Sequence, residues 1–273
     1  MRKKSAHHHP PPKGSFKTLR TFLFVVFFFI VISLAIRIFL AIKAGRYSPS
    51  HRFTIGVLNN SQVLKEVVSF DPVDRSAVVL AINGSEKRLS PEQILGVAFD
   101  DTITTTDKEA EKQPSTLLMD SFLHKGVIRT SLETVDMIRL WLLANSLDQS
   151  AVMHKTLSLP LDTLQIDKLS SSLFPDPLLV SENQTIQIIN STTEPGFGKR
   201  LERMLANMGG NVVLVSTAQL TTDRTKLVYY GDETASVRRL SRILGLVPEK
   251  AVHKTIADIV IILGNSSLNT TMF

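Results

Sequence analysis

Two groups of residues, made up of basic side chains and the glycines beside them, stand in segments with helical periodicity, where they could bind an anionic polymer. The first group is Gly196, Gly198, Lys199, Arg200 and Arg203, and the second is Arg238, Arg239 and Arg242. Backbone N–H groups at a helix start and arginine side chains both bind phosphate and carboxylate groups. All of these basic residues lie off the apolar stripe of their helix, so the alternative is an ordinary solvated face. If the two helices lie side by side, the pattern predicts one continuous basic surface.

The glycine-containing segment Gly196–Lys199 is not a P-loop. The position five residues before Gly198 is Thr193 instead of glycine, and Arg200 follows the lysine instead of serine or threonine. The simpler interpretation is a glycine turn that lets a helix and a strand pack closely, and the anion-binding interpretation stays open beside it.

Other residues that could bind a metal ion or take part in catalysis give weaker signals. Asp100, Asp101, Asp107 and Glu109 could offer oxygen ligands to a divalent cation, but their spacing matches no calcium loop and solvated loop acids are the alternative. The chain has no nucleophile-elbow motif. The sequence therefore predicts no catalytic residue, no metal ligand and no cofactor site.

The most distinctive segment of the chain is the apolar run from residue 19 to residue 42. It carries no charge from Thr21 to Ile36, and Arg37 is the one charge before Lys43. About 22 helical residues reach ~33 Å, which is enough to cross a hydrocarbon core of ~30 Å. The run is longer than a usual signal-peptide core and has no A-x-A-like cleavage site, so a transmembrane signal-anchor is favoured over a cleaved signal or a buried helix.

Charge and composition indicate how this span is placed. Residues 1–18 are basic and proline-bearing, which predicts a disordered tail on the cytoplasmic side, and residues 43–52 are predicted to be a linker on the other side. The net charge of +6 is concentrated in the first twenty residues, so the remainder offers little attraction to nucleic acid. Cysteine is absent, which excludes a disulfide scaffold. The lipid bilayer is thus the first predicted partner.

Residues 53–180 are predicted to form an extracytoplasmic α/β domain. Strands are expected at 53–58, 63–70 and 76–83, a short helix after the Ser90-Pro91 cap, a surface loop over 100–113 and a helix over 114–125. Thr130 and Glu133 suggest a capping box for a further helix. Its apolar side is expected to include Val135, Ile138, Trp141 and Leu142.

Residues 183–266 are predicted to form a second domain, followed by a tail over 267–273. Strands are expected at 185–190, 211–215, 226–230 and 258–263. The intervening helices have apolar stripes of Leu201, Met204, Leu205 and Met208, and of Val237, Leu240, Ile243 and Leu244. The order β-α-β-β-α-β is that of a ferredoxin-like sandwich. The overall fold class is therefore α/β (α+β), with one transmembrane helix before the ectodomain.

The second domain resembles the C-terminal domain of the LytR/CpsA/Psr family. The segment NSTTEPGFGKRLERMLANMGGNVVLV, at 190–215, has that domain's strand end, Pro-Gly turn, helix and glycine stop. The positions that carry the likeness are Asn190, Thr192, Pro195, Gly196, Leu201, Leu205 and Gly209, then Lys226–Gly231, Leu244-Gly245 and Ala257–Gly264. The likeness covers about residues 183–266.

The family's usual catalytic domain, the LCP domain, is predicted to be degenerate or absent here. FTIGVL at 53–58 and VVSFDPVDRSAVVLAIN at 67–83 resemble its first strands. The Arg-Ser-Asp-Thr-like stretch of that domain is missing, and Ile82-Asn83-Gly84-Ser85 stands where it has Ile-Pro-Arg-Asp. Arg75 and Arg88 lie near enough in sequence to serve as substitutes.

The resemblance implies a bacterial cell-envelope protein held at the membrane. The leading hypothesis is a non-catalytic protein that binds or scaffolds wall polymer, or another envelope protein, through its C-terminal domain. The alternative is an LCP-type phosphotransferase that uses Mg²⁺ to move wall polymers from polyprenyl-pyrophosphate carriers to peptidoglycan.

Overall fold

The structure is a computed structural model that describes residues 15–84, 90–106, 113–123, 128–253 and 255–269. The chain divides into two compact units, residues 1–45 and residues 46–273. Helix α1 (Ser15–Ala44) makes up the described part of the first unit. Within the described residues it is the one helix long and apolar enough to cross a membrane, over Leu19–Arg37. Residues 15–18, predicted as disordered tail, belong to α1, and the rest of that tail lies outside the described residues.

The first sheet of the second unit has six strands in the order β5-β4-β1-β2-β3-β6. Strands β1 and β3 run in the same direction as β4 and β6, and β2 and β5 run against them. The strands are β1 (Phe53–Asn59), β2 (Leu64–Asp71), β3 (Ser76–Asn83), β4 (Asp101–Thr105), β5 (Arg129–Thr130) and β6 (Val152–Ser158). The region 100–113, predicted as a surface loop, therefore contains a paired strand; its alternating pattern of buried Asp101, Ile103 and Thr105 was concealed by their polar neighbours.

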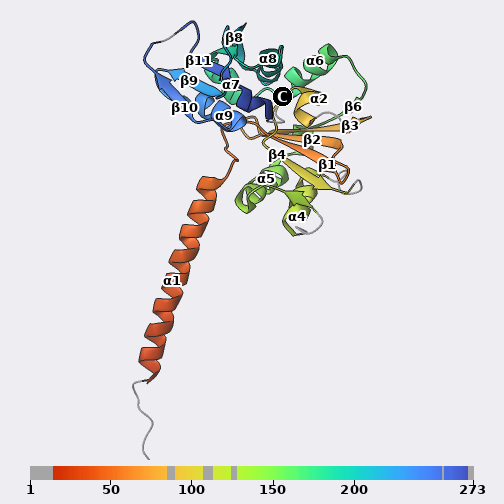
Figure 1. Cartoon of the computed structure of the whole chain (residues 1–273). Coiled ribbons are helices and arrows are strands. Elements are labelled where there is room, and N and C mark those ends of the chain that lie inside the picture. Colours follow the sequence, from red (N-terminus) through yellow and green to blue (C-terminus); the bar gives the residue numbers. More distant parts are fainter. Residues whose placement is uncertain (1–14, 85–89, 107–112, 124–127, 254, 270–273) are drawn as a thin grey trace, which may run out of the picture. The chain divides into compact units, whose positions relative to one another are not determined.

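Helices cover both faces of the first sheet (Figure 1). One face packs against α4 (Pro114–Leu123) and α5 (Thr134–Ser146). The other face packs against α2 (Pro91–Leu95) and α6 (Thr163–Leu173). The predicted capping box at Ser90 is confirmed, because its hydroxyl accepts the N–H of Gln93 and the Gln93 side chain accepts the N–H of Ser90. Short α7 (Pro177–Glu182) then leads to the second sheet.

Helix α5 buries a different face from the one predicted. Asp136, Met137 and Leu140 are buried, whereas Ile138 and Leu142 are exposed. Met137 and Leu140 pack in the core against the first sheet, and on the same face the Asp136 carboxylate accepts a hydrogen bond from the backbone N–H of Arg46 at 2.6 Å. The helix begins after Glu133 without a side-chain cap, so the predicted Thr130–Glu133 capping box is wrong.

The second sheet has five strands in the order β10-β9-β11-β7-β8. Its elements are β7 (Thr185–Asn190), α8 (Phe197–Asn207), β8 (Asn211–Thr217), β9 (Lys226–Tyr230), α9 (Ala235–Leu244), β10 (Pro248–Ala251) and β11 (Ile259–Leu263), with η2 (Asn265–Asn269) after them. The predicted stripes of α8 and α9 are confirmed as buried, apart from Leu244, which is partly buried.

The mixed α/β class is confirmed, but the ferredoxin-like strand arrangement is not. In a split βαβ unit another strand lies between the two parallel strands, whereas β7 and β8 are direct parallel neighbours here. Strand β10, which pairs parallel with β9, was not predicted, because Pro248–Ala251 is short and mostly polar. Strands β7, β8 and β11 consequently end at one edge of the sheet.

A single apolar core joins the two sheets across the boundary predicted near residue 180. It includes Leu95 and Ile166 from the first lobe, defined as residues 53–173, and Met204 and Met208 of α8 from the second lobe, residues 177–269. The Asn207 side-chain amide reinforces this contact by donating to the backbone carbonyl of Gly96 at 3.0 Å. The two lobes are therefore packed as one body.

Candidate functional site

The start of α8 follows a turn that is organised by the side chain of Asn190. The Asn190 side-chain oxygen accepts hydrogen bonds from the backbone N–H and the hydroxyl of Thr192, and its amide donates to the carbonyl of Glu194. Gly196 has a φ of 81°, a left-handed conformation that favours glycine. A Cβ atom on Gly198 would lie 3.2 Å from Val215, which supports the interpretation that this glycine permits close packing of helix and strand.

Other polar loops meet this turn at the carboxyl edge of β7, β8 and β11. The backbone N–H of Thr193 donates to the Asn265 side chain at 3.0 Å, and the N–H of Thr222 donates to the carbonyl of Ser191 at 2.9 Å. In open sheets with parallel strands, ligands bind outside the carboxyl ends of the strands. This edge, with the first turn of α8, is the candidate functional site of the second lobe.

The basic residues of α8 divide into exposed and locking side chains. Lys199 is 70% exposed and pairs with Glu202 at 2.7 Å, and Arg200 pairs with Glu194 while lying over the Phe197 ring. Arg203 instead pairs with Asp167 at 2.6 Å and donates to the carbonyl of Gln93, so it fastens α8 to α6 and α2. Lys199 and Arg200 thus remain on the surface beside the candidate site, and Arg203 does not.

Arg239 does not lie on the predicted basic surface. Its side chain is 3% exposed and forms ion pairs with Asp100 and with Asp176, the latter at 2.9 Å. Burial by itself lowers the pKa of Arg239, but the charges and hydrogen bonds of Asp100 and Asp176 raise it above its ordinary value. A sequence stripe could not reveal this contact, because Asp100 belongs to the first lobe. Arg239 is therefore a structural cation between the lobes.

A layer of charged residues surrounds Arg239 between the two lobes. Arg52 pairs with Asp71 at 2.7 Å, and its carbonyl accepts a hydrogen bond from Arg239 at 3.1 Å. His51 is buried beside them, and its Nε2 lies 3.2 Å from Arg242. Burial and the nearby charge of Arg239 lower the pKa of His51. Residues 43–52, predicted as a linker, thus include two side chains that are built into this layer.

The two other arginines predicted on α9, Arg238 and Arg242, have different partners. Arg238 is exposed and pairs with Glu233 at 3.8 Å. Arg242 is engaged with His51 and with the carbonyl of Arg46. Both therefore lie on the side of α9 where the charged layer reaches solvent, and the structure does not give α8 and α9 one shared row of unpaired cations among the described residues.

The adjacent acids Asp100 and Asp101 serve ion pairs instead of forming a metal centre. The Asp100 carboxylate accepts the backbone N–H of Thr54 and pairs with Arg239, whereas Asp101 accepts from the Ser131 hydroxyl and faces Arg46. In the described part of the chain no three His, Cys, Asp or Glu residues are grouped as metal ligands. Asp107 and Glu109 lie outside the described residues.

Arg75, predicted as a substitute for a catalytic arginine, does not lie at the carboxyl ends of the parallel strands in the first sheet. Strands β1, β3, β4 and β6 end together at Asn59, Asn83, Thr105 and Ser158. Arg75 precedes the beginning of β3, so it lies at the opposite end of the sheet, where it donates to the carbonyl of Ser146 at 3.4 Å. Arg88 lies outside the described residues.

Glu66 is an unusual residue of this sheet. It lies on β2, on the face covered by α4 and α5; it is 8% exposed, and its Oε1 has no hydrogen-bond partner among the described residues. Burial raises the pKa of Glu66 to about 7. Neither residue spacing nor composition distinguishes it from an exposed strand glutamate, so the sequence could not have identified it.

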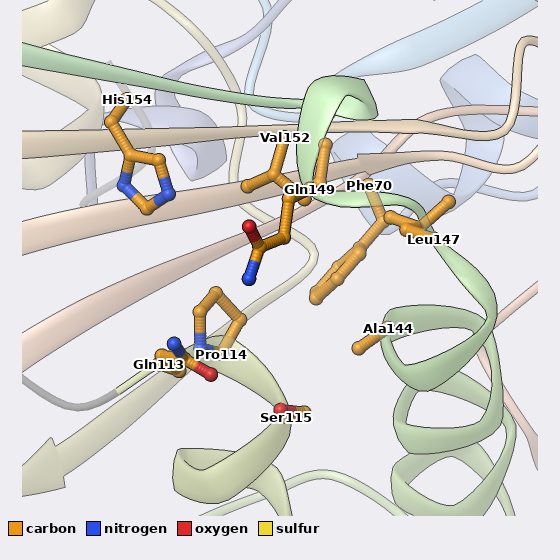
Figure 2. Close-up of a pocket in the computed structure, with 10 residues that line it drawn as sticks. Phe70, Gln113, Pro114, Ser115, Ala144, Leu147, Gln149, Val152 and His154 are labelled. Atoms are coloured by element: carbon orange, nitrogen blue, oxygen red, sulfur yellow. The ribbon is translucent and has the colours of Figure 1, made fainter.

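A cavity of about 330 Å³ opens between α4, α5 and the edge where β3 and β6 begin (Figure 2). Phe70, Leu147 and Val152 give it apolar walls, while Gln149 and His154 point polar groups toward it. No arginine or lysine is among the described residues that line it. The cavity is thus unsuited to hold a pyrophosphate, which needs several cations around it.

One comparison with known protein families identifies a domain in the second lobe. Residues 183–266 match the family model described as LytR cell envelope-related transcriptional attenuator. The second lobe carries the LytR C-terminal domain. The match covers the strands β7, β8, β9, β10 and β11 together with α8 and α9, so the resemblance predicted for residues 183–266 is confirmed. It places this domain among cell-envelope-related proteins.

Comparisons with solved structures and with curated proteins do not extend this match. The crystal structure of the transcriptional regulator yvhJ from Bacillus subtilis is similar with a TM-score of 0.34 and 11% identity, over 45% of this chain and 96% of that chain. No curated protein matches the chain.

Proposed function

We propose that the chain is a single-pass envelope protein whose ectodomain binds wall polymer without catalysing its transfer. The LytR C-terminal domain at residues 183–266 is the observation that carries this proposal, because it is envelope-related. Helix α1 supplies an apolar span of 19 residues, from Leu19 to Arg37, as the anchor. The cytoplasmic placement of the tail follows from the basic residues before the span.

The arrangement of charged side chains supports binding over catalysis. Transfer of a phosphoryl group requires cations that converge on the reacting oxygens. Here Arg203 and Arg239 are committed to ion pairs that join the lobes, and Arg75 lies at the beginning of β3. The exposed Lys199 and Arg200, beside the hydroxyl-rich edge of β7 and β11, instead offer a surface for an anionic chain.

Charge reversal at the start of α8 is expected to weaken binding to wall polymer. The double change Lys199→Glu and Arg200→Glu replaces two attractive contacts with two repulsive ones, and a loss of at least about tenfold in affinity corresponds to ~1.4 kcal/mol. The measurement is cosedimentation of the detergent-solubilised full chain with purified wall material at increasing salt, because attraction between exposed charges is screened by salt.

The matched control reverses two exposed lysines away from this edge, Lys155→Glu on β6 and Lys250→Glu on β10, which change the net charge equally. Equal losses in both double variants would indicate net charge alone, and unchanged binding in the α8 variant would reject this site. Release of the full chain from membranes by alkaline carbonate would reject the anchor separately.

A further inference from the structure

Helix α5 carries an apolar stripe that the protein itself leaves uncovered. Ile138 is 44% exposed and Leu142 is 55% exposed, and they lie one helical turn apart on the same face. Trp141, beside them, is half-buried against the core between α5 and the first sheet. An amphipathic aromatic ring between apolar neighbours and solvent is the arrangement found at membrane interfaces.

The chain enters the ectodomain at the first turn of this helix. The backbone N–H of Arg46 donates to Asp136 of α5 at 2.6 Å, and the ring of Tyr47 lies against Phe53 with 6.0 Å between centroids. Only a short segment separates Arg37, at the end of the apolar span, from Arg46. Even fully extended, this segment reaches roughly 30 Å. The length of this segment therefore sets an upper limit on the distance between the first turn of α5 and the end of the apolar span.

The charge at this end of α5 suits an anionic lipid surface. The Arg46 side chain is half-exposed, and Arg139 follows Ile138 in the helix. Burial raises the pKa of Tyr47, and the positive charge of Arg139 partly opposes that effect, which places Arg139 near the entry of the chain. Basic residues near an anionic bilayer add electrostatic attraction to the burial of apolar side chains.

We infer that the Ile138–Trp141–Leu142 face of α5 rests on the bilayer surface, with Arg46 and Arg139 at the level of anionic headgroups. The ectodomain then contacts the bilayer through α5, in addition to its covalent link to the α1 span. This inference rests on the proposed anchor. It concerns a different surface from the polymer site on α8.

Trp141 is the one tryptophan of the chain, so its fluorescence reports on this face alone. The full chain is reconstituted in nanodiscs of phosphatidylglycerol and phosphatidylcholine whose acyl chains carry bromine at a shallow or a deep position. With excitation that avoids tyrosine, we expect bromine to quench Trp141, and more strongly at the shallow position. Replacing Ile138 and Leu142 together with serine is expected to abolish most of this quenching.

The matched control replaces Leu164 of α6 and Val180 of α7 with serine, since both are exposed apolar residues on other helices. It is expected to leave the quenching unchanged. Trp141 that is unquenched by brominated lipid in a folded, incorporated protein overturns the inference. Protection of Trp141 from aqueous iodide without quenching by lipid also overturns it, because the core between α5 and the first sheet then covers the ring. Failure of the chain to incorporate into nanodiscs would instead reject the anchor.

Discussion

Replacing Arg239 with methionine is expected to lower the free energy of unfolding of the second unit, residues 46–273, by about 3 to 5 kcal/mol, because it leaves buried carboxylates without their cation. Asp100 and Asp176 both pair with this guanidinium, and Asp176 is fully buried. Both carboxylates would then remain between the lobes without the cation that pairs with them directly. Urea denaturation of the full chain in detergent, followed by far-ultraviolet circular dichroism, measures the change.

The neighbouring Arg238 provides the control for this prediction. It is exposed and pairs with Glu233 in solvent, so Arg238→Met is expected to change the stability by less than about 1 kcal/mol. Arg239→Lys keeps the charge but cannot reproduce the forked contact with two carboxylates, so an intermediate loss is expected. Similar stabilities for Arg239→Met and the unchanged chain would contradict the role assigned to the charged layer.

Replacing Glu66 with glutamine is expected to alter the pH dependence of stability by about 2 to 3 kcal/mol between pH 5 and pH 8. The pKa of Glu66 rises from 4.5 to about 7 on burial, so the folded state holds the proton more tightly than the unfolded state. Ionisation of Glu66 therefore leaves the free energy of unfolding unchanged below pH 4.5. It lowers this free energy progressively between pH 4.5 and pH 7, and the full loss of stability is present above pH 7. Glutamine does not ionise, so this loss of stability at high pH should disappear.

The comparison is made as the difference between the unfolding free energies at the two pH values, which removes any constant effect of the amide. His51 is present in both proteins, and its lowered pKa acts in the other direction, by reducing stability as the pH falls below 6.5. Glu249, which is exposed on β10, is the control, and Glu249→Gln should keep the original profile. Parallel profiles for the Glu66→Gln variant and the unchanged chain would show that Glu66 is not buried as described.

Local patterns in the sequence predicted the elements whose own residues determine them. The stripes of α8 and α9, the Ser90 cap and the strands from Phe53 to Asn83 follow from the order of residues within each segment and were predicted correctly. Strand β4 was missed because its polar residues are stabilised by partners far away in sequence, such as Ser131 for Asp101. The same limit applies to β10, whose register depends on β9.

The candidate site was predictable only in part for a related reason. Gly196 and Gly198 occupy the turn and helix start that their spacing predicts. Whether each arginine is exposed or buried in an ion pair, however, depends on which acidic residue lies next to it in the fold. Arg239 meets Asp100 across the two lobes, and no helical periodicity contains that information. Likewise, the hydrogen-bond donor to buried Asp136 of α5 is the backbone of Arg46, which lies well outside the helix.

The core that runs through α8 has a consequence for how this chain behaves as a modular protein. The segment that matches the family begins at residue 183, yet Met204 and Met208 within it are covered by side chains of the first lobe. A fragment cut at that boundary would expose this apolar surface and lose the bond from Asn207 to Gly96. The segment that matches the family is thus smaller than the unit that shares this apolar core, and the first lobe covers apolar side chains of the second.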